Sequence, residues 1–326
     1  MSNRVAIIRK MNELGSGEKP FVFIIDFEMK EPLLFPVNEI NATEILFDIN
    51  GITNYSNHEK SCNPDFYFCK FPLSYNVYLK AFDIVQQNLK YGNSYLVNLT
   101  FPTRIETDLP LRDIFFCSKA KYKLFYREKF VVFSPEIFVR ISENGVISSF
   151  PMKGTIDAAI KNAENIILND KKEYAEHCTI VDLIRNDLNI VAKDVYVEKF
   201  RYIDRIKTHE KELLQVSSQI CGTLESDYHK HIGDIIFRLL PAGSISGAPK
   251  KKTVEIINEA EGYNRGYYTG VFGYFDGKTL DSGVMIRFIE KINEELYYKS
   301  GGGITVYSDP QKEYQELIDK VYVPFV

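Results

Sequence analysis

A single lysine lies in a turn-forming segment and could act either as a positive charge or as a nucleophile. Lys153 belongs to the segment FPMKGT, where Pro151 restricts the backbone, Gly154 permits a tight turn and Thr155 supplies a hydroxyl. A free lysine has a pKa of about 10.4, so a nucleophilic amine at neutral pH needs neighbours that lower it by several pH units. The alternative is an ordinary surface lysine in a turn.

Glu136, in the segment VVFSPEIF, is a candidate acid for this amine. The residues between Glu136 and Lys153 have the pattern of a β-hairpin with an ENG turn, which can bring two strand ends into one pocket. A carboxylic acid beside an amine can protonate a departing hydroxyl group. A structural salt bridge is the competing explanation.

Carboxylates on two expected helices could hold a divalent cation. Glu176 shares a helix face with Ile180 and Leu183, which places it on an inward stripe, and Glu313 and Glu316 are one turn apart in the last helix. A buried carboxylate needs a proton or a cation, and Mg²⁺ typically takes one or two carboxylates together with substrate oxygens and water. For each helix an ordinary charged face is the alternative.

Two small-residue segments and one arginine could bind anions. LLPAGSISGAPK, which contains Ser244, leads into a helix, and a second segment contains Gly301 to Gly303. Tyr268 and Arg287 lie between them in the sequence, and an arginine at the end of an apolar strand is costly unless it meets a carboxylate. A tight turn at the glycines and an internal salt bridge of the arginine remain alternatives.

These residues must be positioned by both strands and helices. Helices are expected at about 74–90, 170–188, 227–240 and 248–257, with a last helix capped by Asp309 and carrying Pro310 in its first turn. Strand patterns occupy 21–25, 45–48, 94–106, 121–134 and 137–150, and a hairpin with Asp276-Gly277 at its turn follows Tyr268. Strands and helices in blocks predict an α+β fold with antiparallel sheets.

Composition limits the remaining choices. The chain has 326 residues, is 45% hydrophobic and 26% charged, and carries a net charge of −4, which gives no indication of a nucleic-acid or membrane partner. Five scattered cysteines suggest reduced thiols, and no signal peptide or membrane span is recognisable, so a cytoplasmic protein is expected. No linker interrupts the chain, which predicts one compact domain over 1–326, with a β-rich part at 1–70 and a catalytic core at 71–326.

Nine of these segments, from Tyr91 to the C-terminus, together resemble the chorismate-utilising enzymes. They occur in the family's order: YLVNLT, FSPE, PMKGT, AEHCTIVDLIRNDL, GSISGAPK, RGYYTGVFGYF, IR, GGG and EYQE. The resemblance implies the chorismate-binding, anthranilate synthase-like fold, with two antiparallel β-sheets flanked by helices and a shortened N-terminal part. Lys153 favours the aminodeoxychorismate-forming branch, which has PIKGT, over the anthranilate synthases, which have PIAGT.

The resemblance also implies a role for each candidate residue. Lys153 would attack C2 of the chorismate ring while Glu136 protonates the C4 hydroxyl, and ammonia would then attack C4 to give 4-amino-4-deoxychorismate. The other roles are a Mg²⁺ site at Glu176, Glu316 and Glu313, an enolpyruvyl carboxylate site at Tyr268, Arg287, Gly301 and Gly303, and a ring site at Ser244, Gly154 and Thr155.

Three departures from the family pattern and one missing motif complete the expectations. Gln215 replaces a family histidine, Tyr307 replaces an acid, and the shortened N-terminal part predicts no tryptophan pocket. No cysteine lies in a glutaminase motif, so a separate glutamine amidotransferase subunit is expected to deliver ammonia. The alternatives are anthranilate synthase component I, an isochorismate-forming enzyme, and a binding or regulatory protein without catalysis.

Overall fold

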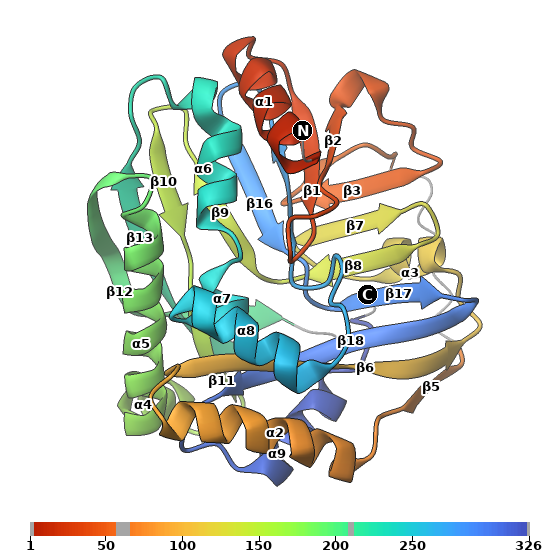
Figure 1. Ribbon diagram of the computed structural model, residues 1–326, viewed down its shortest axis with the longest axis vertical. Coiled ribbons are helices and arrows are strands. Elements are labelled where there is room, and N and C mark those ends of the chain that lie inside the picture. Colours follow the sequence, from red (N-terminus) through yellow and green to blue (C-terminus); the bar gives the residue numbers. More distant parts are fainter. Residues whose placement is uncertain (1–2, 57–65, 208–211, 325–326) are drawn as a thin grey trace.

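The structure is a computed structural model that describes residues 3–56, 66–207 and 212–324. Its strands form two β-sheets with antiparallel pairing throughout the described residues, and helices cover them, as Figure 1 shows. The predicted α+β class with two antiparallel sheets is therefore confirmed. No described helix is both long enough and apolar enough to cross a lipid bilayer.

The first sheet carries the segment that contains Lys153 at one edge. Its strand order is β11-β13-β10-β9-β16-β15-β1-β2, and β12 pairs with β13 outside this path. The bounds are β11 (Met152–Asp157), β13 (Glu212–Thr223), β10 (Val146–Ser149), β9 (Ile137–Ile141), β16 (Leu280–Val284), β15 (Val271–Phe275), β1 (Phe21–Ile25), β2 (Leu33–Pro36) and β12 (Lys193–Lys207).

The second sheet contains the glycine-rich strand. Its order is β14-β6-β18-β17-β8-β7-β3-β4, and β5 pairs with β6. The bounds are β14 (Gly247–Ala248), β6 (Leu96–Thr107), β18 (Glu295–Ile304), β17 (Phe288–Ile292), β8 (Phe130–Ser134), β7 (Tyr122–Tyr126), β3 (Ile45–Ile49), β4 (Ile52–Thr53) and β5 (Phe68–Phe71).

The apolar run of β1 shows how the core holds the sheets together. Val22 and Ile24 point into a cluster that includes Phe47 of the second sheet, whereas Phe21 and Phe23 point into the cluster beneath the helices. Because both faces are covered, the strand is apolar at every position instead of alternating.

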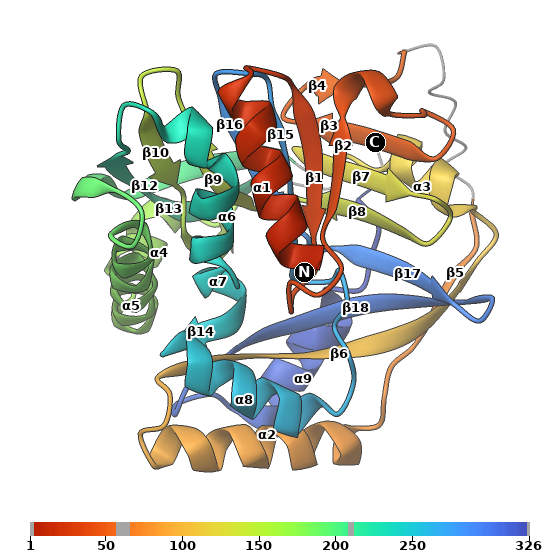
Figure 2. The same ribbon diagram turned by 45° about the horizontal axis from the view of Figure 1, so that its top comes forward.

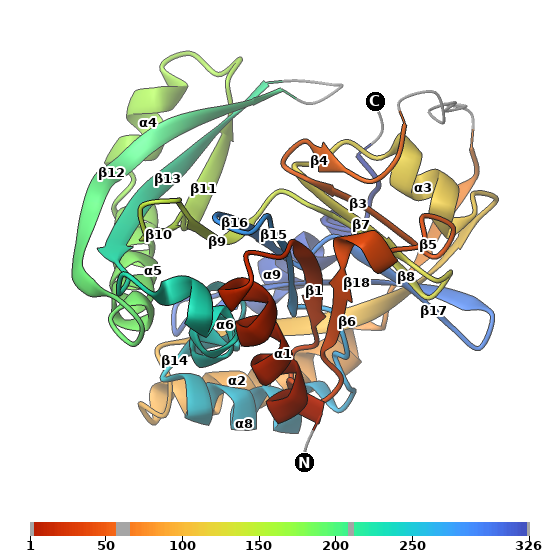
Figure 3. The same ribbon diagram turned by 90° about the horizontal axis from the view of Figure 1, so that it is seen from above.

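The helices lie in groups around the sheets, and those groups place the candidate acids. Helix α1 packs on α6, α2 on α8, α9 on β18, and α5 on β11 and β13. Figures 2 and 3 show α4 and α5 beside β12 and β13 at one end of the molecule, away from β3 and α3, and Figure 3 shows β11 in the same group. The bounds are α1 (Asn3–Ser16), α2 (Tyr75–Lys90), α3 (Leu111–Cys117), α4 (Ala163–Asn169), α5 (Lys171–Leu188), α6 (Ile232–Leu239), α7 (Gly243–Ser246), α8 (Lys250–Glu261) and α9 (Pro310–Asp319), with 3₁₀ turns at Val37–Glu39 and Tyr228–His231.

The start of α9 agrees with its expected cap, and α5 has a similar cap that was not predicted. The Asp309 side chain accepts a hydrogen bond from the Lys312 backbone N–H at 2.9 Å, with Pro310 opening the helix, and Asp170 accepts one from Glu173 N–H at 2.9 Å. These caps satisfy backbone donors that the first turn of a helix leaves unpaired. The predicted starts of α5 and α9 are confirmed to within one residue.

Two expectations about the chain were wrong or incomplete. Residues 3–16 were not expected to be helical, yet they form α1, whose Met11 and Leu14 are buried. Cys69, Cys178 and Cys221 are free thiols, but Cys117 is disulfide-bonded, contrary to the expectation of reduced thiols throughout. Sequence spacing does not show which cysteine side chains meet in space, and a disulfide requires that they do.

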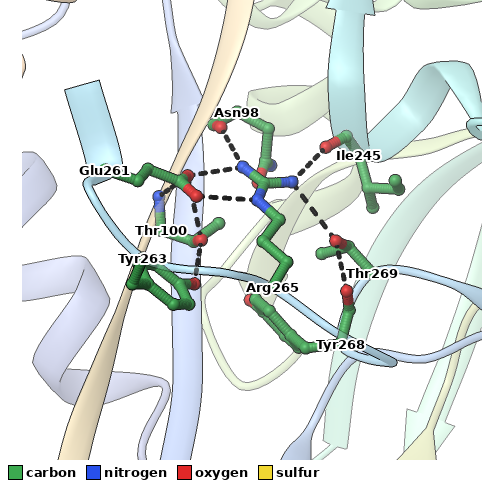
Figure 4. A network of polar contacts seen from close by, with 8 residues as sticks. All are labelled: Asn98, Thr100, Ile245, Glu261, Tyr263, Arg265, Tyr268 and Thr269. Atoms are coloured by element: carbon green, nitrogen blue, oxygen red, sulfur yellow. Dashed lines mark hydrogen bonds and ion pairs between the residues drawn. The ribbon is translucent and has the colours of Figure 1, made fainter. Parts of the chain in front are cut away.

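A buried ion pair joins the helices to the second sheet (Figure 4). The Arg265 guanidinium donates to Glu261 Oε2 at 2.8 Å, to the Asn98 carbonyl at 2.6 Å and to the Ile245 carbonyl at 3.1 Å. Glu261 Oε1 also accepts from the Thr100 backbone N–H at 2.8 Å. This network fixes β6 against the segments that carry Ser244 and Tyr268.

Replacing Arg265 with methionine should destabilise the fold strongly. The substitution leaves the Glu261 carboxylate buried without its counter-ion, a change that typically costs about 3–5 kcal/mol of unfolding free energy. Urea unfolding followed by circular dichroism measures this loss. Arg127→Met is the matched control, because Arg127 and Glu44 form an exposed pair at 2.8 Å and its loss should cost less than about 1 kcal/mol. Equal losses in the two variants would contradict the prediction.

Candidate active site

Lys153 occupies an irregular point at the edge of the first sheet. Met152 pairs with Ser217 and Thr155 pairs with Gln215, so β11 contains one more residue than β13 between the two pairs. Such a β-bulge redirects a side chain, and Gly154 meets the required geometry with a φ of 85°. The bulge turns the Lys153 side chain toward α5.

The Lys153 ammonium forms an ion pair with Glu176. Their Nζ and Oε2 atoms are 2.8 Å apart, and the Glu176 side chain is only 17% exposed. Burial lowers the pKa of Lys153, but the charge and hydrogen bond of Glu176, with smaller contributions from Glu173 and Glu316, raise it above the ordinary value. In this arrangement Lys153 is an ammonium, which is not nucleophilic.

The acids of α9 lie over the glycine strand. A side chain built on Gly302 would meet Glu313 Oε2 at 3.3 Å and Glu316 Oε1 at 3.5 Å. Glu316 pairs with Lys320 at 2.6 Å, and Lys320 also donates to the Gly301 carbonyl at 2.8 Å. Burial raises the pKa of both acids, but Lys320 brings that of Glu316 below its usual value.

The two predicted halves of a metal site therefore each carry a lysine partner: Lys153 on Glu176 and Lys320 on Glu316. Within the described residues no three acids, histidines or cysteines are grouped closely enough to hold a metal ion. The donor set is nevertheless chemically suited to a hard cation, since it consists of carboxylate oxygens.

A cavity of about 130 Å³ lies beside these acids. Four predicted residues line it: Glu136, Ser244, Tyr268 and Arg287, together with the backbone at Gly301. Lys153, Gly154, Thr155 and Gly303 are not among the lining residues in the described part of the chain. Lys320 lines the cavity and binds Glu316, so it connects the cavity with the acids near Lys153.

Glu136 presents a buried acid to this cavity. Ser244 Oγ donates a hydrogen bond to Glu136 Oε1 at 2.5 Å. Burial raises the pKa of Glu136, whereas the Ser244 hydrogen bond and the charges of Lys320 and Arg287 lower it, and the net direction is upward. A carboxyl group that keeps its proton above the usual pH range is suited to general acid catalysis.

Arg287 offers a guanidinium to the same cavity. It follows β16 with a positive φ of 54°, donates to the Lys320 carbonyl at 3.2 Å and lies 5.1 Å from the Tyr322 ring centre. In the described residues it makes no ion pair with a carboxylate, so the internal salt bridge considered from the sequence is absent there. A largely buried guanidinium without an anion is the arrangement expected of a carboxylate-binding site.

Sequence reasoning did not single out several cavity residues, among them Asn98, Lys299 and Lys320. Lys320 could have been found, because it lies four residues after Glu316 on the same helix face. Asn98 lies in the quoted segment YLVNLT. Lys299 is buried and forms an ion pair with Glu290 at 2.6 Å. Its position two residues before the glycines of β18 was the only sequence feature that indicated a role in the site.

A buried histidine lies beneath the lysine segment. His177 Nε2 lies 2.7 Å from Ser218 Oγ, and burial together with the charge of Arg201 lowers the pKa of His177 to about 4. Gln215, expected in place of a family histidine, faces Thr155 Oγ1 at a long 3.5 Å. The neutral His177 packs α5 against the first sheet.

Comparisons with known proteins identify the family. The family model for chorismate binding enzymes matches residues 37–325. An uncharacterized PabA-like protein of Haemophilus influenzae is 50% identical over 97% of this chain and 96% of its own length. A probable chloroplastic aminodeoxychorismate synthase of rice is 35% identical over 59% of this chain and 22% of its own length, and anthranilate synthase component 1 of Aquifex aeolicus is 36% identical over 61% and 40%.

Solved structures with a similar fold include other chorismate-utilising enzymes. Anthranilate synthase component I from Streptococcus pneumoniae superposes with a TM-score of 0.68 at 26% identity, covering 82% of this chain and 61% of that one. The menaquinone-specific isochorismate synthase of Escherichia coli has a TM-score of 0.71 at 15% identity over 97% and 80%, a likeness of fold alone. The chain therefore belongs to the family of chorismate binding enzymes.

Proposed function

We propose that this chain is the chorismate-binding component of an aminodeoxychorismate synthase, which converts chorismate and ammonia into 4-amino-4-deoxychorismate. The observation that carries the proposal is Lys153, which a β-bulge directs onto Glu176. An amine at this position can bond to the substrate ring and form a covalent intermediate. An enzyme without such an amine would depend on direct attack of ammonia on the ring. The relatives named for a reaction align with only about three fifths of the chain, and they include both aminodeoxychorismate and anthranilate synthases.

Chorismate is a dianion, and the cavity has complementary charge. Arg287, Lys299 and Lys320 line it, and of the three Arg287 lacks a carboxylate partner in the described residues. The enolpyruvyl carboxylate would bind Arg287, with Tyr268 and the Gly301 backbone alongside. Gly154, Thr155 and Gly303 would approach the ligand from the neighbouring strand segments.

The proposed reaction has two displacements. The Lys153 nitrogen bonds to C2 of the ring, both double bonds of the conjugated diene shift by one position, and the C4–oxygen bond breaks as Glu136 gives its proton to the departing hydroxyl, which leaves as water. Ammonia then bonds to C4, both double bonds shift back, and the C2–nitrogen bond breaks to return the neutral amine. The new C4 ammonium group gives one proton back to the Glu136 carboxylate, which restores the acid for the next turnover.

Mg²⁺ is the proposed cofactor, held by Glu176, Glu316 and Glu313. A bound Mg²⁺ would neutralise these carboxylates and bind the ring carboxylate of the substrate. Glu176, which pairs with the Lys153 ammonium, and to a smaller extent Glu316 also raise the pKa of Lys153. Loss of that pairing would favour the free amine that the first displacement needs.

Glu176→Gln should weaken the binding of the divalent cation by about 10- to 100-fold, because it replaces a charged oxygen donor with a neutral one. Titration with Mn²⁺, followed by electron paramagnetic resonance with chorismate present, measures this affinity without turnover. Glu164→Gln is the control, since Glu164 is an exposed acid paired with Arg205. Unchanged Mn²⁺ affinity in Glu176→Gln would remove Glu176 from the metal site.

A glutamine amidotransferase subunit is the proposed source of ammonia, with free ammonia at high concentration as a substitute. The deciding experiment identifies the product formed from chorismate, Mg²⁺ and ammonium at alkaline pH. Aminodeoxychorismate supports the proposal, anthranilate assigns the chain to the anthranilate synthases, and isochorismate assigns it to water-using relatives. Binding of chorismate without any consumption would indicate a binding protein.

A further inference from the structure

A second buried ion pair lies behind the proposed acid. Lys250, the first residue of α8, places its Nζ 2.8 Å from Asp187 Oδ2 at the end of α5, and the two side chains are only 19% and 11% exposed. Removing two charges from water is expensive and is offset only by good geometry and further hydrogen bonds. Lys250 makes such a further hydrogen bond, and Asp187 lies in close contact with the backbone of the same segment.

These contacts hold the segment between α6 and α8 at two points. Lys250 Nζ donates to the Leu239 carbonyl at 2.7 Å, and the Asp187 carboxylate lies against the Gly243 backbone, whose N–H lowers the pKa of Asp187. A side chain built on Gly243 would come within 2.7 Å of Asp187 Oδ2. Only glycine lets the carboxylate approach this backbone so closely.

The segment held in this way carries Ser244. Ser244 directly follows Gly243, and its hydroxyl donates to Glu136 at 2.5 Å. Asp187, Gly243, Ser244 and Glu136 also line one small cavity of about 20 Å³, the space of roughly one water molecule. The Asp187–Lys250 ion pair therefore contacts Gly243, the residue directly before the serine that hydrogen-bonds Glu136.

We propose that Asp187 and Lys250 are positioning residues, which hold the Gly243 backbone so that the Ser244 hydroxyl points at Glu136. The inference rests on the proposed role of Glu136 as proton donor. Asp187 lies on α5, the helix that carries Glu176. Helix α5 thus carries Glu176, the partner of Lys153, near its start and Asp187, which positions the Ser244 segment, at its end.

The test is a double-mutant cycle between Asp187→Asn and Ser244→Ala, with chorismate consumption as the readout. Asparagine keeps the size of the side chain but loses its charge. Each single variant should lower kcat by about 10- to 100-fold, since small displacements of positioned groups have effects of this size. In Asp187→Asn the KM for chorismate should stay within about 2-fold, because Asp187, unlike Ser244, does not line the larger cavity. The double variant should be no slower than Ser244→Ala alone.

Lys250 gives an independent arm in case Asp187→Asn does not fold. Lys250→Arg keeps the charge and should retain most of kcat, whereas Lys250→Met should lower kcat as Asp187→Asn does. Asp281→Asn is the matched control, because Asp281 pairs with Arg140 at 3.0 Å and neither residue is among the residues that line the two cavities containing Glu136. It should lower the melting temperature and leave kcat unchanged.

Two outcomes would overturn the inference. One is a double variant in which kcat falls by the product of the two single-variant reductions, which would mean that Asp187 and Ser244 act independently. The other is a lower melting temperature with unchanged kcat in Asp187→Asn and Lys250→Met, which would show a purely structural pair. Because consumption of chorismate is measured, a product other than aminodeoxychorismate leaves this test intact and counts only against the proposed reaction.

Discussion

Replacing Lys153 with methionine should reduce the formation of aminodeoxychorismate by about 10⁴-fold, the order expected when an enzyme loses its nucleophile. Methionine keeps the length and apolar stem of the side chain but cannot bond to C2 of the ring. Product formation with saturating ammonium, followed by liquid chromatography, measures the loss. Lys161→Met, at an exposed position nearby in the sequence, serves as the control and should behave like the parent chain.

Lys153→Arg separates the two roles that a lysine can have here. Arginine can keep the ion pair with Glu176, which Lys153 makes at 2.8 Å, but stays protonated and is no nucleophile. Activity should therefore be lost in this variant as well. Incubation of the parent chain with chorismate without ammonia should add the mass of dehydrated chorismate to the peptide that contains Lys153. Substantial turnover by Lys153→Arg would mean that only the charge matters.

The sequence was informative where a local pattern determines structure. Asp309 and Pro310 predicted the start of α9, and the ENG segment predicted the turn between β9 and β10, where Gly145 has a φ of 76°. Both features depend on a few adjacent residues. The spacing of Ile7, Met11 and Leu14 could have revealed α1 by the same logic, but the short apolar stripe was not recognised.

Long-range contacts were predicted less well. Glu136 and Lys153 were expected to share a pocket, but Lys153 instead meets Glu176, and Glu136 faces Ser244, Arg287 and Lys320. The bulge in β11 determines where the Lys153 side chain points, and no sequence pattern predicts that one strand contains an extra residue. Buried pairs such as Asp187 and Lys250 join residues distant in the chain, so only the fold reveals them.

Glu136→Gln should lower kcat by about 10²- to 10⁴-fold, the usual contribution of a general acid. Glutamine still offers an oxygen to the Ser244 hydroxyl, which donates to Glu136 at 2.5 Å, so the fold around it should persist. Glu143→Gln, at an exposed acid paired with Lys278, is the matched control.

The pH dependence of the reaction rate tests whether Glu136 is the proton donor. Burial raises the pKa of Glu136 against the opposing effects of Ser244, Lys320 and Arg287, so the carboxyl group stays protonated to a higher pH than an exposed glutamate. As a proton donor it works below its pKa, and the rate of the parent chain should fall as the pH rises through that value. Glutamine has no proton to lose in this range. Its residual rate should therefore lack this decline, and a decline that persists in Glu136→Gln would assign the acid to another group.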